Sequence, residues 1–348
     1  MAHQPAPAAP RSGNRPAPAA PNPPRRAARP VYAALDLGTN NCRLLIARPA
    51  DTGFIVVDAF SRIVRLGEGL AASGRLSDAA MDRAVAALSI CADKIRRRHV
   101  SLVRSVATEA CRRADNGREF VDRVHRETGL ALEVISPEQE ARLAVLGCHA
   151  LLEPGDGPAL IFDIGGGSTE LILIEPGDGA PRVLDWFSAP WGVVSLTESE
   201  PHELPGRDDR LAAYARMRAR VAEAFRTFAA KLGRIGDVPR RLLGTSGTVT
   251  TLASVHLALP SYERRAVDGL IVPAESMRAI STRLSAMSVA ERATLPCIGT
   301  ERADLVVAGC AILDTILDLW PTDRLGVADR GIREGILRSL MARDGARR

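Results

Sequence analysis

The stretch DIGGGSTE at residues 163–170 decides the fold class, because it repeats DLGTNNCR of residues 36–43 after an interval of 127 residues. With no gap, the 26 positions that begin at Asp36 and at Asp163 share nine identical residues. A random sequence of this composition would give about two identities over the same length. The shared positions include Asp, Gly, Pro and Phe, which apolar strands seldom align by chance. We infer an internal duplication.

Each copy predicts the same order of elements. Apolar strands cover 31–35, 44–47 and 54–59 in the first copy, and 159–162, 171–174 and 182–187 in the second. Gly and Pro stand at the breaks, which is typical of strands joined by hairpins. Apolar residues at helical spacing then predict long helices over 78–98 and 208–232.

Two βββαβα units in tandem predict an α/β protein with duplicated domains and a cleft between them. We place the N-terminal domain at residues 31–152 and the C-terminal domain at 153–341, with the change in the turn near 150–157. Residues 1–30 are rich in Pro, Ala and Arg, and we expect a disordered tail there.

Composition limits the class of function. Of the 46 lysines and arginines, five lie in the tail, and the remainder equal the 41 acidic residues in number. The body is therefore neutral, and its charge does not indicate nucleic-acid binding. No apolar stretch is long enough for a membrane span or a secretory signal. Six cysteines without a C-x-x-C pair fit a reducing cytoplasm.

The second copy of the repeat predicts a phosphate site. Gly165, Gly166 and Gly167 carry no Cβ, so their N–H groups can converge on one anion, with the positive φ that glycine tolerates. A strand follows, which excludes a P-loop and a dinucleotide fingerprint. The flanking carboxylates of Asp163 and Glu170 favour a hard divalent cation, Mg²⁺, beside the phosphate. The alternative is a structural turn.

The first copy offers side-chain donors in place of glycines. Thr39, Asn40 and Asn41, after Gly38, can donate to phosphate oxygens, and Arg43 adds positive charge. A third small-residue loop, GTSGT at residues 244–248, follows the strand 241–243 and opens an apolar helix. Gly247 and Thr248 there suit a second phosphate or a nucleotide, and an ordinary βα turn is an equal alternative.

These loops and several further motifs resemble the exopolyphosphatase/guanosine pentaphosphate phosphohydrolase (Ppx/GppA) family, a branch of the actin-like (ribonuclease H-like) superfamily. The resemblance covers about residues 31–341, without an additional C-terminal helical domain. The motifs are DLGTNNCRL at 36–44, ATEACR at 107–112, ISPEQEARL at 135–143, FDIGGGSTE at 162–170, GTSGT at 244–248, ERAD at 301–304 and RGIREG at 330–335.

The resemblance implies hydrolysis of a terminal phosphoanhydride with a divalent metal. It implies that Glu140 is the catalytic base and that Arg112 contacts a phosphate. It also implies that Asp163 and Glu170 are the acids that bind the metal and position the water. By the same resemblance, we expect Ser168, Thr169 and Arg302 to be phosphate ligands. Independently, Ser136, Pro137 and Gln139 predict a capped helix start that fixes Glu140 one turn in. An acid that only complements the helix dipole is the alternative.

We therefore predict a cytoplasmic, Mg²⁺-dependent enzyme that releases terminal orthophosphate from inorganic polyphosphate. Guanosine pentaphosphate is the alternative substrate, because Ser195 and the Thr39–Asn41 segment depart from the family pattern near the substrate. A non-catalytic sensor of polyphosphate or guanosine tetraphosphate and a small-molecule kinase are the alternatives of other classes. A homodimer is left open. Long polyphosphate requires an extended basic groove, for which the candidate residues are Arg240, Arg241, Arg264 and Arg265.

Overall fold

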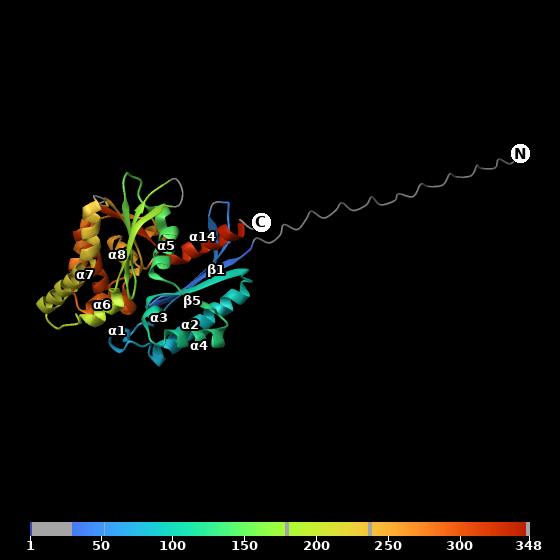
Figure 1. The fold of residues 1–348 in the computed structure, drawn as a ribbon, viewed down its shortest axis with the longest axis horizontal. Coiled ribbons are helices and arrows are strands. Elements are labelled where there is room, and N and C mark those ends of the chain that lie inside the picture. The colour runs from blue at the N-terminus through green and yellow to red at the C-terminus, as the bar shows by residue number, and fades with distance from the viewer. Residues whose placement is uncertain (2–29, 52, 178–180, 236–238, 346–348) are drawn as a thin grey trace.

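The computed structural model describes Met1 and residues 30–51, 53–177, 181–235 and 239–345, so the predicted tail lies almost entirely outside the described residues. The chain forms two lobes, each built on one sheet (Figure 1). The first sheet has the strand order β3-β2-β1-β4-β5. Its strands are β1 (Tyr32–Leu37), β2 (Asn41–Pro49), β3 (Phe54–Ile63), β4 (Leu102–Ala107) and β5 (Leu132–Val134).

The second sheet repeats this order and adds one antiparallel edge strand, giving β8-β7-β6-β9-β11-β10. Its strands are β6 (Ala159–Ile164), β7 (Thr169–Glu175), β8 (Arg182–Ala189), β9 (Arg241–Thr245), β10 (Ile271–Pro273) and β11 (Arg324–Ala328).

The two sheets share a local irregularity that supports the duplication. A β-bulge interrupts the pairing between Ile46 and Ala47 in the first sheet and between Leu173 and Ile174 in the second, again 127 residues apart. Bulges are retained features of a strand pair rather than accidents of packing. The predicted α/β fold with two duplicated units is confirmed.

Helices cover the outer faces of both sheets. The two long helices agree with the prediction to within a few residues: α2 is Asp78–Arg97, with Ser77 as its N-cap, and α7 is Arg207–Ile235. The first lobe also holds α1 (Leu70–Ser73), α3 (Glu109–Arg113) and α4 (Gly117–Thr128). The second holds α6 (Val193–Ser199), α8 (Gly247–His256), α9 (Arg264–Val267), α10 (Ala274–Ala286), α11 (Val289–Ala293), α12 (Gly299–Arg302) and α13 (Val306–Leu319).

Two helices, α5 (Pro137–Cys148) and α14 (Ile332–Gly345), lie between the sheets (Figure 1). They approach backbone to backbone, since a Cβ on Gly147 would lie 1.9 Å from the carbonyl oxygen of Gly331. A Cβ on Gly335 would lie 2.0 Å from that of Leu143. Only glycine permits such contact. One apolar cluster joins these helices to the inner faces of both sheets.

The last helix complicates a division of the chain by sequence alone. α14 follows the second sheet in the chain but packs on α5 and on β1 and β2 of the first. The ranges 31–152 and 153–341 therefore remain a prediction for the domains. No helix in the described ranges is long and apolar enough to cross a membrane.

Candidate active site

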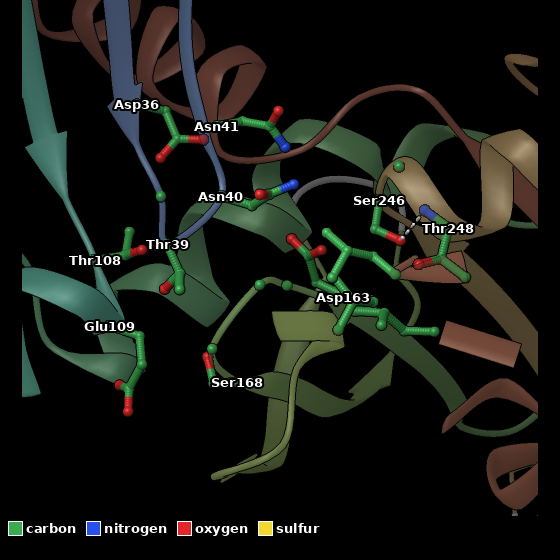
Figure 2. Close-up of a pocket in the computed structure, with 18 of the residues that line it drawn as sticks. Asp36, Thr39, Asn40, Asn41, Thr108, Glu109, Asp163, Ser168, Ser246 and Thr248 are labelled. Atoms are coloured by element: carbon green, nitrogen blue, oxygen red, sulfur yellow. Dashed lines mark hydrogen bonds between the residues drawn. The ribbon is translucent and has the colours of Figure 1, made fainter. Parts of the chain in front are cut away.

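A cavity of about 140 Å³ lies between the lobes, where the turns after β1, β6 and β9 meet. Figure 2 shows residues of the first lobe (Asp36, Thr39 and Asn40) across the pocket from Asp163, Ser168 and Ser246 of the second. The cavity brings together fifteen of the predicted site residues: Gly38, Thr39, Asn40, Asn41, Arg43, Glu140, Asp163, Gly165, Gly166, Gly167, Ser168, Glu170, Gly247, Thr248 and Arg302.

One of the two reasons predicted for the glycines of the second hairpin, a positive φ, is wrong. None of Gly165, Gly166 and Gly167 has a φ in the left-handed region, so that part of the prediction is wrong. Close approach explains them instead. A Cβ on Gly166 would lie 3.0 Å from Asn40 N, and one on Gly167 would lie 2.8 Å from Thr39 Oγ1. The two hairpins of the repeat are in contact across the cleft.

Asp36 and Asp163 end the central strands of the two sheets, at equivalent positions of the repeat. Asp36 Oδ1 is buried without a hydrogen-bond partner among the described residues. Burial, together with the charges of Glu170 and Asp36, raises the pKa of Asp163 to about 8. Burial likewise raises the pKa of Asp36, against the attraction of Arg43. Burial disfavours the charged form of both carboxyls, and a cation beside them would stabilise that form.

Glu170 is held by hydroxyl donors. Its Oε1 accepts hydrogen bonds from Ser168 (2.7 Å) and from Ser188 (2.9 Å), which lies opposite it on β8. Burial raises the pKa of Glu170, and these two hydrogen bonds lower it. Thr169, in contrast, does not line the cavity, because its hydroxyl donates to the carbonyl oxygen of Trp191 at 2.7 Å. Its predicted role as a phosphate ligand is not supported by this orientation.

Glu140 lies on the first turn of α5, and the capping box that fixes this turn is present as predicted. The side chain of Glu140 is 9% exposed. Arg112 donates to Glu140 Oε2 from Nη1 (3.2 Å) and from Nη2 (3.3 Å). Burial and the charge of Glu170 raise the pKa of Glu140 well above its usual range, and Arg112 lowers it.

Arg112 does not itself line the cavity, so the predicted direct phosphate contact is not seen. Its guanidinium is occupied on three sides: by Glu140, by Glu109 Oε2 at 2.7 Å and by the carbonyl oxygen of Ile135 at 2.7 Å. Arg112 therefore orients the carboxylate of Glu140. Glu109 lines the cavity itself.

The third loop contributes the N-terminus of α8 and a strained residue. Ser246 has a φ of 128°, which is unfavourable for any residue other than glycine, and its hydroxyl accepts from Thr248 N. Arg43 reaches this loop from the opposite lobe, since a Cβ on Gly247 would lie 3.6 Å from its Nη2. Arg302 Nη1 donates to Thr251 Oγ1 at 2.7 Å beside the cavity.

Five polar lining residues were not among the predicted site residues: Asp36, Thr108, Glu109, Ser246 and Thr251. Asp36 had a signal in the sequence, because the repeat aligns it with Asp163. Glu109 and Thr108 stood within a motif of the resemblance. The strain at Ser246 has no signal in the residue type.

Two of the four arginines considered for a basic groove are held in contacts within the protein. Arg241 donates to the carbonyl oxygen of Glu153, and Arg264 pairs with Glu334 at 2.9 Å and with Asp329 at 3.1 Å. These two cations are engaged within the protein at separate places. No group of three or more His, Cys, Asp or Glu side chains in the described ranges is arranged as a ready metal site.

Comparison with known proteins agrees with this geometry. The profile of the Ppx/GppA phosphatase family matches residues 45–344. Exopolyphosphatase 2 of Mycobacterium tuberculosis is 33% identical over 325 residues, which cover 88% of this chain and 98% of that protein. The guanosine-5'-triphosphate,3'-diphosphate pyrophosphatase of Aeromonas hydrophila is 29% identical over 318 residues, 90% of this chain but 60% of that protein. The crystal structure of the Aquifex aeolicus member of the Ppx/GppA family matches with a TM-score of 0.72 and 30% identity, covering 90% of this chain and 98% of that one.

Proposed function

The chain belongs to the Ppx/GppA phosphatase family, and from that premise we propose that it releases terminal orthophosphate from inorganic polyphosphate. The observation that carries the proposal is Glu140. This buried carboxylate opens onto a cavity that contains the phosphate-type loops of both lobes. A site for binding alone does not need a buried carboxylate beside its anion, where it repels the ligand. A hydrolase needs one, to take a proton from water.

The proposed reaction is direct attack of water on the terminal phosphorus. Both contacts from Arg112 go to Glu140 Oε2, so Oε1 is the oxygen available to the attacking water. Glu140 accepts the proton, and the P–O bond to the rest of the chain breaks, which leaves orthophosphate and a polyphosphate shortened by one unit. Arg43 and Arg302, one from each lobe, neutralise negative charge on the phosphoryl oxygens.

Mg²⁺ is the proposed cofactor, and the residues fit it. Asp36 and Asp163, one from each lobe, both line the cavity, and Asp36 Oδ1 is buried without a hydrogen-bond partner in the part of the chain that the structure describes. Mg²⁺ is usually held by one or two carboxylates together with substrate oxygens and water, so a ready cage of three side chains is not required. When bound, it would supply charge neutralisation on the phosphoryl oxygens. Glu170, whose Oε1 is taken by two serines, has one oxygen left for a bridging water.

Guanosine pentaphosphate is the second candidate substrate. The chain spans about 60% of the length of the guanosine pyrophosphatase relatives and nearly all of exopolyphosphatase 2. The higher identity to exopolyphosphatase 2, 33% against 29%, favours polyphosphate. The sensor alternative is less favoured, because it leaves the paired Glu140 and Arg112 without a role. The kinase alternative is less favoured, because the matching family is one of phosphatases.

Phosphate release from polyphosphate and from guanosine pentaphosphate, each with Mg²⁺ and with excess chelator, tests the proposal. We expect metal-dependent release from polyphosphate at a higher kcat/KM. Binding of both anions without any release would support the sensor. Consumption of ATP only in the presence of an added acceptor would support the kinase.

A further inference from the structure

The segment between β3 and α1 contacts both lobes beside residues that line the cavity. We call residues 64–70 the clasp. On the first lobe it is fixed to the phosphate-type loop: Arg65 N donates to the carbonyl oxygen of Asn40 at 3.0 Å, and Gly67 N donates to that of Thr39 at 2.9 Å. A Cβ on Gly67 would lie 2.2 Å from Thr39 Cγ2, so the clasp and the loop are packed without a gap. The two segments therefore move together.

The same segment crosses to the second lobe at two points. Arg65 Nη1 donates to Asp304 Oδ2 at 2.9 Å, and its Nη2 lies 3.5 Å from the carbonyl oxygen of Glu301. Gly69 N donates to Glu198 Oε1 on α6 at 2.8 Å. The main-chain φ of Arg65 is 47°, an unfavourable value for a residue with a side chain. The backbone is thus held in the conformation that sends this side chain across the cleft.

The contact at Asp304 surrounds a residue of the site. Arg302 stands between Glu301 and Asp304, the two residues that Arg65 touches, and it lines the cavity. From the far side, the fully buried Arg292 donates to the carbonyl oxygen of Ala303 at 2.8 Å. α12 is only four residues long and has no side-chain cap, so it depends on such contacts for its position.

We propose that Arg65 and Asp304 form a latch that positions Arg302 against the Thr39–Asn40 loop when the cleft is closed. The proposal rests on the proposed function, since Arg302 there neutralises charge on the transferred phosphoryl group. Arg65 touches no reacting atom and is a positioning residue. Because the ion pair is about one-third exposed (33% and 32%), it adds little to global stability. Misplacement of a charge-neutralising group by about 1 Å can cost about 100-fold in rate.

A double-mutant cycle on phosphate release from polyphosphate tests the latch. Arg65→Ala and Asp304→Ala should each lower kcat about tenfold or more, with KM changed less than about threefold. The double variant should be no slower than the slower single variant within about twofold, because either change opens the same latch. Arg65→Lys and Asp304→Asn, which disturb folding less, should show smaller losses in the same pattern. Losses that multiply to about 100-fold in the double variant, or no loss in the singles, would overturn the proposal.

Arg104→Ala is the matched control, because it removes another partly exposed pair of an arginine and a carboxylate, Arg104 with Glu133, inside the first lobe. Its kcat should remain within about twofold of the native value, with a similar small change in Tm. If Arg104→Ala lowers kcat as much as Arg65→Ala does, the effect is general destabilisation and the latch is wrong.

Amide hydrogen exchange separates the latch from the proposed function. Peptides that span residues 298–305 should exchange several-fold faster in Arg65→Ala than in the native protein, and those of α2 should not change. Unaltered exchange at 298–305 would refute the latch even if the native protein hydrolyses polyphosphate. Absence of phosphate release by the native protein, with the exchange difference present, would refute the proposed function and leave the latch standing.

Discussion

Replacing Asp163 by Asn should stabilise the metal-free protein at pH 8 while it abolishes activity. The ordinary pKa of an Asp is 3.8, and in this site burial, Glu170 and Asp36 raise it to about 8. A raised carboxyl pKa means that the folded state binds the proton more tightly than the unfolded state. Its contribution to stability is complete below about pH 4 and is lost as the pH rises toward 8.

The magnitude follows from that shift. Each pH unit between the two pKa values costs up to about 1.4 kcal/mol, so from pH 6 to pH 8 the native protein loses about 2 kcal/mol through Asp163. The Asn variant has no ionisable group at this position, so its free energy of unfolding should fall by about 2 kcal/mol less between pH 6 and pH 8. For a lobe of this size, 1 kcal/mol corresponds to roughly 2–4 °C in Tm. The difference between the two proteins should therefore change by about 4–8 °C.

Thermal unfolding of the metal-free proteins at pH 6 and pH 8 measures this difference. Asp156→Asn, in the exposed turn between the lobes, is the control and should follow the native protein. Addition of Mg²⁺ at pH 8 should raise the Tm of the native protein more than that of Asp163→Asn. Equal pH dependence in the native and Asp163→Asn proteins would refute the reasoning, because Asp163 would then not be the group that titrates.

Three further predictions concern the same cleft. Gly192→Ala should lower kcat/KM at least tenfold, because its Cβ would lie 2.4 Å from the carbonyl carbon of Gly166 and displace the hairpin; a native rate would contradict the packing. Ser188→Ala removes a donor to Glu170 and should move the acid limb of the pH–rate profile up by about one unit. Ser61→Ala, at the equivalent position of the first sheet, should leave that limb in place, and an unmoved limb in both variants would exclude this role for Glu170. Chelation of divalent metal should abolish phosphate release and its return should restore it, and chelator-resistant release would remove the metal from the proposal.

The gap-free repeat made much of the fold predictable. An offset of 127 residues predicts the first three strands of each sheet and the equivalence of their loops, and the bulges in β2 and β7 lie at the same offset. It does not reveal where the last helix packs. α14 returns to the first lobe because of close contacts at Gly147 and Gly335, and each of these is an isolated glycine in the sequence.

The site was predictable where local sequence carries the chemistry. Glu140 is fixed by a capping box that can be read directly from Ser136 and Gln139. The sequence does not reveal that Arg112 donates to Glu140 or that Thr169 donates to the carbonyl oxygen of Trp191. Both contacts depend on how side chains on separate elements are oriented. Arg65 is the clearest case, because its partner lies 239 residues away and in the other lobe. The Mg²⁺ requirement, the cytoplasmic location and homodimerisation remain predictions.

Glu140→Gln is the most direct test of the proposed function, because the amide keeps the size of the side chain and its contact with Arg112 but cannot accept the proton. We predict that kcat for phosphate release from polyphosphate falls by about 10²–10⁴. Affinity for polyphosphate and Tm should stay close to the native values. A Glu140→Gln protein that releases phosphate within tenfold of the native rate would contradict the assignment of Glu140 as the base, and with it the proposed reaction in this cleft.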